Sequence, residues 1–279
     1  MTAVTVDQRV AKLEAAATRI RRNALTMGEV QGQGYIGQAL GIADVLAVFY
    51  ARDGGELRHR PDDPGWEGRD RFLLSIGHYA IALYAALAEA GTIPLDELET
   101  YGSDGSRLPM SGMASYTPGM EISGGSLGHG LAVGCGMALG LRRLGNPARV
   151  FNLLSDGELD EGSTWEAALA GAHHGLANLT AIVDVNGLQA DGPTTGVLRT
   201  EPVTEKWRAF GWHAVRVDGN DIPALLAALD RIREHTSGPS VLICDTRIGR
   251  GVPFLETREK AHFMPVAQHE WQAARDELG

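Results

Sequence analysis

The chain has 279 residues, of which 44% are hydrophobic and 6% aromatic, and its formal net charge is −10. This length and aliphatic content suit a single α/β domain, while the negative charge and the lack of a long Lys/Arg run argue against nucleic acid as a partner. No apolar stretch could span a membrane or serve as a signal peptide, so we expect a cytoplasmic protein.

The first half of the chain is expected to be largely helical. Apolar residues recur at helical spacing from Val6 to Met27, a glycine-rich segment covers residues 31–40, and a second helix follows at 41–51. A polar loop then precedes a short apolar strand at 71–75. The remaining elements of this half are, in order, a helix at 79–90, a long loop rich in Gly, Ser and Pro at 101–123, and an apolar helix at 127–144.

In the second half, strands and helices alternate. The expected strands are at 150–154, 179–185, 213–217 and 240–245, and the helices between them are at 163–175, 204–210 and 222–235. This alternation predicts an α/β fold in which a parallel sheet carries helices on both faces. We therefore expect residues 1–279 to form a single domain that binds its ligand beyond the carboxyl ends of the strands.

Two polar loops follow consecutive strands of this half. Residues 155–162 read Ser-Asp-Gly-Glu-Leu-Asp-Glu-Gly, and residues 184–189 read Asp-Val-Asn-Gly-Leu-Gln. Neighbouring parallel strands would bring Asp156 and Asn186 to one sheet edge, where carboxylate, amide and carbonyl oxygens suit Mg²⁺ and a bound phosphate. Gly157 would let the backbone approach an anion closely, and the following helix would point its N–H groups toward it. Each loop alone is an ordinary turn, but the pair predicts a magnesium–phosphate site.

The sequence around these loops resembles the transketolase family, in particular the N-terminal chain of transketolases that are split across two genes. The loops are similar to the thiamine diphosphate motif of that family, Gly-Asp-Gly followed one strand later by Asn, with Ser155 in place of the first glycine. The other similar stretches are residues 69–78, 118–128, 156–166, 182–192 and 206–212. The resemblance covers nearly the whole chain and implies the thiamine-diphosphate-binding fold of the family's diphosphate (PP) domain.

The resemblance implies two cofactors, thiamine diphosphate and Mg²⁺, with Ca²⁺ or Mn²⁺ able to take the place of Mg²⁺. The metal would be held by Asp156, Asn186 and the carbonyl group of Leu188. The implied cofactor-contacting residues are Gly125, Leu127, His129, Asp156, Gly157, Glu158 and Asn186. His129 stands where the family commonly has Gln, so a cofactor contact and a helix-capping role both remain open.

The reaction that the resemblance implies is transfer of a two-carbon ketol unit from a ketose to an aldose. It gives catalytic roles to His78, which lies in a Ser-x-Gly-His turn, and to His262, which aligns with a late substrate-pocket histidine. A neutral imidazole at His262 could move the proton of a substrate hydroxyl. The other histidines are expected to be structural, apart from His129.

Glu161 is the third residue with an implied catalytic role. In the family it would meet a partner chain, near the glutamate that activates the aminopyrimidine ring. That glutamate belongs to the pyrimidine-binding half, which should begin about where this chain stops. We therefore expect the partner to be a separate C-terminal subunit, and the complex to be α₂β₂.

Two positions depart from the family pattern. Tyr35, in Gly34-Tyr35-Ile36-Gly37, replaces a histidine that contacts the sugar, and Ser111 lies where another substrate histidine is usual. A pocket that loses imidazole donors and gains a phenol should prefer a different substrate. The sequence therefore predicts an unusual sugar substrate in place of the ordinary pentose phosphates.

Three rival interpretations bear on this function. Residues 32–37 fit G-x-G-x-x-G, but they follow a helical stretch instead of a strand, which argues against a nicotinamide dinucleotide. The chain could also be half of another thiamine diphosphate enzyme that acts on a 2-oxo acid donor. A non-catalytic structural subunit is the third possibility, although the set of metal and diphosphate ligands argues against it.

Overall fold

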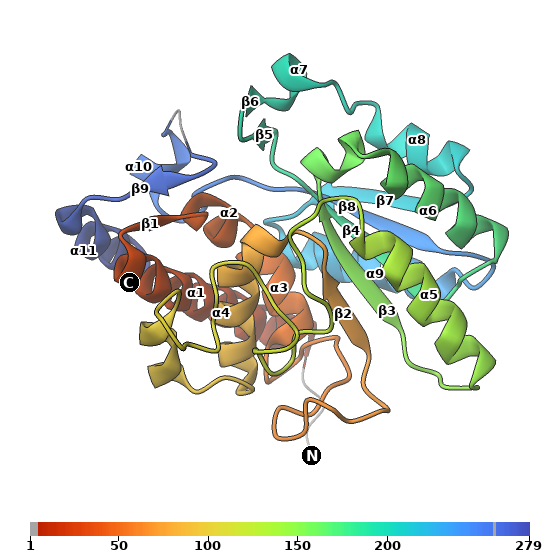
Figure 1. The fold of residues 1–279 in the computed structure, drawn as a ribbon, viewed down its shortest axis with the longest axis horizontal. Coiled ribbons are helices and arrows are strands. Elements are labelled where there is room, and N and C mark those ends of the chain that lie inside the picture. The colour runs from red at the N-terminus through yellow and green to blue at the C-terminus, as the bar shows by residue number, and fades with distance from the viewer. Residues whose placement is uncertain (1–4, 259–260) are drawn as a thin grey trace.

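The computed structural model describes residues 5–258 and 261–279, and a five-stranded parallel sheet lies at its centre (Figure 1). The order of its strands is β2-β3-β4-β8-β7. Their bounds are Arg71–Leu74 for β2, Val150–Ser155 for β3, Leu179–Val185 for β4, His213–Asp218 for β7 and Ser240–Asp245 for β8. All five strands fall where the sequence predicts them, and the parallel sheet confirms the predicted fold class.

Helices cover both faces of the sheet (Figure 1). On one face lie α1 (Val6–Gln31), α3 (Ala43–Tyr50), α4 (Ala80–Ala90) and α9 (Ile222–Glu234); on the other lie α5 (Gly130–Arg143), α6 (Gly162–His173) and α8 (Val203–Ala209). The strands are buried on both sides, because alternate side chains join different clusters. In β3, Phe151 and Leu153 pack with the α1 layer, whereas Val150 and Leu154 pack with the α5 layer.

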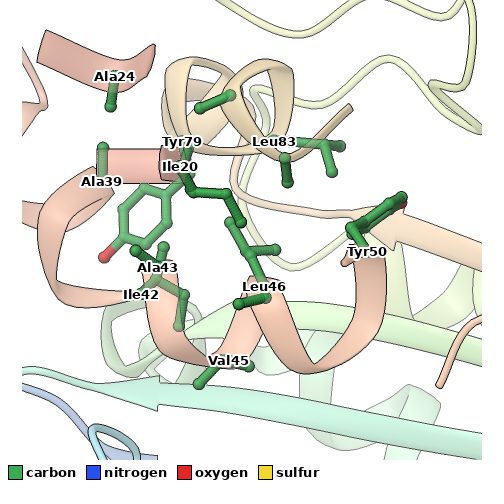
Figure 2. Close-up of a cluster of buried hydrophobic side chains, with 14 of the residues drawn as sticks. Ile20, Ala24, Ala39, Ile42, Ala43, Val45, Leu46, Tyr50, Tyr79 and Leu83 are labelled. Carbon is green, nitrogen blue, oxygen red and sulfur yellow. The ribbon is translucent and has the colours of Figure 1, made fainter. Parts of the chain in front are cut away.

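The larger cluster is built where α1, α3 and α4 meet. Figure 2 shows Ile20 of α1 and Leu46 of α3 packed with Leu83 of α4, and all three side chains are at most 1% exposed. Tyr79 enters the same cluster from the turn that precedes α4. The packing of Tyr79 in this cluster of α1, α3 and α4 therefore anchors the turn that carries the neighbouring His78.

A segment expected to be irregular contains a helix. Helix α1 continues to Gln31 and ends at Gly32, whose φ of 66° is readily adopted by glycine. Strand β1 (Gln33–Gly34) follows, and then the short helix α2 (Ile36–Gly41), where the sequence predicted only a glycine-rich segment. All six residues of α2 are buried, so tertiary packing stabilises a helix that its two glycines disfavour locally.

Strand β1 pairs with β9 (Met264–Pro265) in an antiparallel ladder. The pairing brings a segment near the start of the chain against one near its end, beside the sheet. Glycines allow the close approach: a Cβ on Gly37 would lie 2.4 Å from Ile248 and 3.0 Å from the backbone oxygen of Ala261. This contact places Tyr35 next to His262.

The remaining elements are short or peripheral. They are β5 (Leu188–Gln189), β6 (Gly192–Pro193), α7 (Thr194–Val197), α10 (Pro253–Glu256) and α11 (Gln268–Glu277). Helix α11 was not predicted, since it buries only Trp271 and Ala274 on an otherwise polar surface. Among the helices that the structure describes, none has both the length and the apolar character needed to cross a bilayer.

Candidate active site

The two polar loops meet at the carboxyl edge of the sheet, as the sequence predicts. Strands β3 and β4 are parallel neighbours with Ser155 opposite Asp184, so the residues that follow them leave the sheet side by side. The backbone N–H of Gly187 donates to Oδ2 of Asp156 at 2.9 Å. Asp156 and Asn186 are thereby brought together across the two loops.

Asp156 is a buried carboxylate whose hydrogen-bond donors are backbone N–H groups. Burial, reinforced by the nearby charge of Asp184, raises the pKa of Asp156 to about 7, although N–H groups of Gly187, Gly157 and Asn186 act in the opposite direction. The side chain is 2% exposed. A carboxylate that is desolvated in this way gains more from a bound cation than a carboxylate in water does.

Asp184 lies beneath this site and orients Asn186. Its carboxylate accepts hydrogen bonds from the hydroxyl groups of Tyr79 (2.8 Å) and Thr246 and from Nδ2 of Asn186 (2.9 Å). The amide N–H₂ of Asn186 also donates to the Tyr79 oxygen, so Oδ1 of Asn186 faces the other way and accepts from the N–H of Leu188. No spacing in the sequence marks Tyr79 or Thr246, because they follow different strands.

Glu158 is fully buried and joins three segments. Its carboxylate accepts hydrogen bonds from the hydroxyl of Ser75, the N–H of Gly128 (2.8 Å) and the N–H of Ser155. Burial raises the pKa of Glu158 to about 7. Glu158 thereby connects the ends of β2 and β3 to the glycine loop (residues 124–128) and holds these three segments together.

The glycine loop, residues 124–128, packs directly on the turn that carries His78. A Cβ on Gly77 would lie 2.5 Å from backbone atoms of Gly124 and Gly125, so only glycine fits there. Gly125 has a φ of 142° and is exposed, and the hydroxyl of Ser111 lies 3.5 Å from where its Cβ would be. The loop thus brings Gly125 and Ser111 to the same edge as His78.

Leu127, His129 and Glu161 lie at or next to the C-terminal end of this loop. Leu127 is partly buried against the core, whereas His129 and Glu161 are exposed. The His129 ring lies with Nδ1 3.0 Å from the Leu127 oxygen and makes no side-chain cap for α5, so the helix-capping role is not the one it adopts. Glu161 lies close to the end of the loop: a Cβ added to Gly128 would lie 2.7 Å from the Cβ of Glu161.

Three predicted residues form an aromatic cluster beside the loop. The Tyr35 ring lies 4.4 Å from the His78 ring and 5.4 Å from the His262 ring, measured between centroids, and the two imidazoles are 5.6 Å apart. Phe263, which the sequence did not single out, packs 5.1 Å from Tyr35 and is 41% exposed. Burial, with His262 nearby, lowers the pKa of His78 to about 4, and burial also lowers the pKa of His262. Both imidazoles are therefore neutral at pH 7.

The sequence of the chain matches a known protein family. Residues 13–279 match the family model "Transketolase, thiamine diphosphate binding domain". The chain belongs to the transketolase family. This confirms the resemblance expected from the two loops and the surrounding stretches.

Relatives in the transketolase family match nearly the whole chain. Transketolase family protein y4mO of Sinorhizobium fredii is 65% identical, with 94% of this chain and 93% of the relative covered. The 6-deoxy-6-sulfo-D-fructose transketolase subunit SqwG of a Clostridium species is 37% identical (95% and 96% covered). An apulose-4-phosphate transketolase subunit from Actinobacillus succinogenes is 38% identical (96% of each).

Solved transketolases share the fold. The transketolase from Leishmania mexicana superimposes with a TM-score of 0.88 at 29% identity, over 96% of this chain. The chain spans only 41% of the length of that protein, whereas it spans 96% of the two relatives named as subunits.

The oxygen donors at this edge of the sheet suit a divalent cation. In the part of the chain that the structure describes, no three His, Cys, Asp or Glu side chains gather into a metal site. A cation would therefore depend on mixed oxygen donors, which Asp156 and Asn186 supply, with the carbonyl of Leu188 beside them. A Cβ on Gly157 would lie 3.7 Å from Gln189 and Ser155, an ordinary packing distance, so the surrounding packing does not itself require glycine here.

Proposed function

We propose that this chain is the diphosphate-binding subunit of a thiamine diphosphate- and Mg²⁺-dependent transketolase that acts on an unusual sugar. The observation that carries the proposal is the Tyr35 phenol, which packs against both His78 and His262 where the family has a third imidazole. Two relatives of similar length are named for 6-deoxy-6-sulfo-D-fructose and apulose-4-phosphate, neither of which is an ordinary pentose phosphate.

The residues divide the work along the sheet edge. Asp156, Asn186 and the Leu188 carbonyl would hold the metal, and Gly157, Gly125, Leu127 and His129 would line the cofactor. When bound, thiamine diphosphate supplies the electron sink for cleavage of a carbon–carbon bond. His78, His262, Tyr35 and Ser111 would orient the sugar, because a neutral imidazole has one nitrogen that donates a hydrogen bond and one that accepts.

We propose that residues 1–279 act as one domain and need a second subunit that carries the pyrimidine-binding half. The support is that relatives of the same length are named as subunits, while single-chain transketolases are more than twice as long. Glu161 is exposed next to the glycine loop, where it would meet the partner. An α₂β₂ complex would then place each cofactor between two kinds of subunit.

The test is a donor panel assayed with the purified complex of this chain and its C-terminal subunit. We expect ketol transfer from 6-deoxy-6-sulfo-D-fructose, apulose-4-phosphate or a related ketose to exceed transfer from xylulose 5-phosphate to ribose 5-phosphate. Tyr35→His should shift the preference toward the pentose phosphates, because it restores the imidazole. Full activity of the unaltered complex on the pentose phosphate pair would refute the unusual-substrate proposal.

The same panel separates the rival activities. A 2-oxo acid donor should give no product, since the family match is to transketolase. If the complex turned over 2-oxo acids and no ketose, the alternative thiamine diphosphate activity would be correct. If no donor reacted although cofactor bound, the chain would be a structural subunit.

A further inference from the structure

Gln38 is a buried residue of α2 that contacts His262 twice. Its side-chain Nε2 lies 2.7 Å from the backbone oxygen of His262 and 3.0 Å from the ring atom Nδ1. The residue is 1% exposed. Within residues 5–258 and 261–279, no donor reaches its Oε1, so the amide is committed to His262 through its nitrogen alone.

The two contacts fix the orientation of the amide and the tautomer of the ring. A backbone carbonyl oxygen only accepts hydrogen bonds, so the Gln38 atom next to it must be the N–H₂ group. The second hydrogen of that group points to Nδ1 of His262, which must then accept. A neutral imidazole with an accepting Nδ1 carries its proton on Nε2.

We infer that Gln38 is a positioning residue that fixes His262 as its Nε2–H tautomer, so that His262 presents a hydrogen-bond donor to the site. In the proposed ketol transfer, on which this consequence rests, His262 would donate to a substrate oxygen. It would not take up the hydroxyl proton expected from the sequence, since its basic nitrogen is occupied.

The test is nitrogen NMR of the full chain with ¹⁵N-labelled histidine, in which a protonated ring nitrogen gives a pyrrole-type shift and an unprotonated one a pyridine-type shift. The His262 signals are those that vanish in His262→Gln. We expect Nδ1 to be pyridine-type and Nε2 pyrrole-type. Gln38→Glu replaces the donor with an acceptor, so it should move a proton onto Nδ1.

The matched control is Gln31→Glu. Gln31 also donates through Nε2, at 2.7 Å, but to the backbone oxygen of Tyr101 and not to a ring, so its substitution should leave the His262 signals unchanged. A wild-type ring protonated on Nδ1 would overturn the inference. So would a folded Gln38→Glu chain whose Nδ1 stays unprotonated.

A second measurement decides the question if Gln38→Glu does not fold. In the wild-type chain labelled uniformly with ¹⁵N, an N–H···N bond should give a scalar coupling between Gln38 Nε2 and His262 Nδ1, and its absence would overturn the inference. Neither experiment needs cofactor, partner or substrate. A failed ketol-transfer assay therefore leaves this inference intact, and a failed NMR test leaves the proposed activity intact.

Discussion

Burial sets the charges of the titratable groups at the sheet edge. It raises the pKa of Asp156 to about 7 and lowers the pKa of His78 to about 4. In both cases the low-polarity surroundings oppose the charged form of the group. The acid would therefore gain from a cation that neutralises it, whereas the imidazole of His78 stays neutral at pH 7.

Removing the Asp156 carboxylate should weaken cofactor binding. Loss of one charged ligand should cost about 1.5–3 kcal/mol or more, which is roughly a tenfold to hundredfold loss of affinity. Calorimetric titration of the Asp156→Ala complex with thiamine diphosphate and Mg²⁺, with the partner subunit present, measures this. Asp62→Ala, which removes an exposed carboxylate from the polar loop before β2, is the control and should bind as the wild type does. Unchanged affinity of Asp156→Ala would contradict the metal assignment.

His78 should make the chain less stable in acid. Its pKa is about 4 when folded and near its ordinary 6.5 when unfolded, so the unfolded chain binds more protons between these values. Stability is then lost as pH falls from 6.5 toward 4, by roughly 1 to 3 kcal/mol. Urea unfolding at pH 7 and pH 5 should show a smaller acid loss for His78→Gln than for wild type.

The difference between the two proteins is the quantity to compare in that experiment. Glu158 has its pKa raised to about 7, so its contribution to stability changes with pH in the opposite sense. Both proteins contain Glu158, and its contribution cancels. Equal acid losses in wild type and His78→Gln would contradict the neutral, buried state of His78.

Some of these residues could be predicted from the sequence and others could not. Asp156 and Asn186 were paired correctly because the register of adjacent parallel strands brings the ends of those strands together. Tyr79 and Gln38 were missed, since each acts through a hydrogen bond to a residue far away in sequence. Such contacts depend on tertiary packing, which leaves no fixed spacing in the chain.

At the scale of elements, the site depends on how closely two loops can approach. The glycine loop lies on the His78 turn, where Gly77 and Gly124 leave room for backbone against backbone. Glu158 then connects this loop to the end of β3. The position of the loop is thus set by missing side chains on one side and by a buried acid on the other.

Gly77→Ala should displace the glycine loop. The new Cβ would lie 2.5 Å from main-chain atoms that have no rotamer to yield, so we expect a loss of about 1–3 kcal/mol in the free energy of unfolding and weaker cofactor binding. Gly140→Ala in α5 is the matched control. No atom lies within 4 Å of its Cβ, and it should be neutral or stabilising by up to about 1 kcal/mol. Equal unfolding curves for the two variants would contradict the close-approach argument.

The sequence predicted the five strands of the central sheet better than it predicted the two-residue strands and the short or polar helices. Strands buried on both faces are nearly continuous apolar runs and were easily recognised. Helix α2 was missed because two of its six residues are glycine, and α11 because only two of its ten residues are buried. Both are stabilised by the segments that they pack against.

At the scale of the whole molecule, a buried ion pair connects separate parts of the α1 layer. Arg21 of α1 donates to both carboxylate oxygens of Asp44 and to the oxygen of Leu40, and the Asn220 amide also donates to Asp44. Arg21 and Asp44 are 7% and 6% exposed. The pair thus ties α1 and α3 to the loop after β7.

Removing one partner of this pair should be strongly destabilising. Asp44→Ala leaves the Arg21 charge buried without its carboxylate, which should cost about 3–5 kcal/mol. Asp230→Ala breaks an ion pair of similar length with Arg233 on the surface, and should cost at most about 1 kcal/mol. Chemical unfolding of both variants measures the contrast. A loss of less than about 1 kcal/mol for Asp44→Ala would show that the pair does not hold these parts together.

The pairing of β1 with β9 bears on how the protein is made. Gln38 and His262 are 224 positions apart, so a ribosome has released the first long before the second is synthesised. The two polar loops can meet once residues 184–189 have been synthesised, but Tyr35 must wait for His262 before its aromatic cluster can form. A nascent chain that stalls after β8 would therefore carry both polar loops but would lack the contact of Tyr35 with His262.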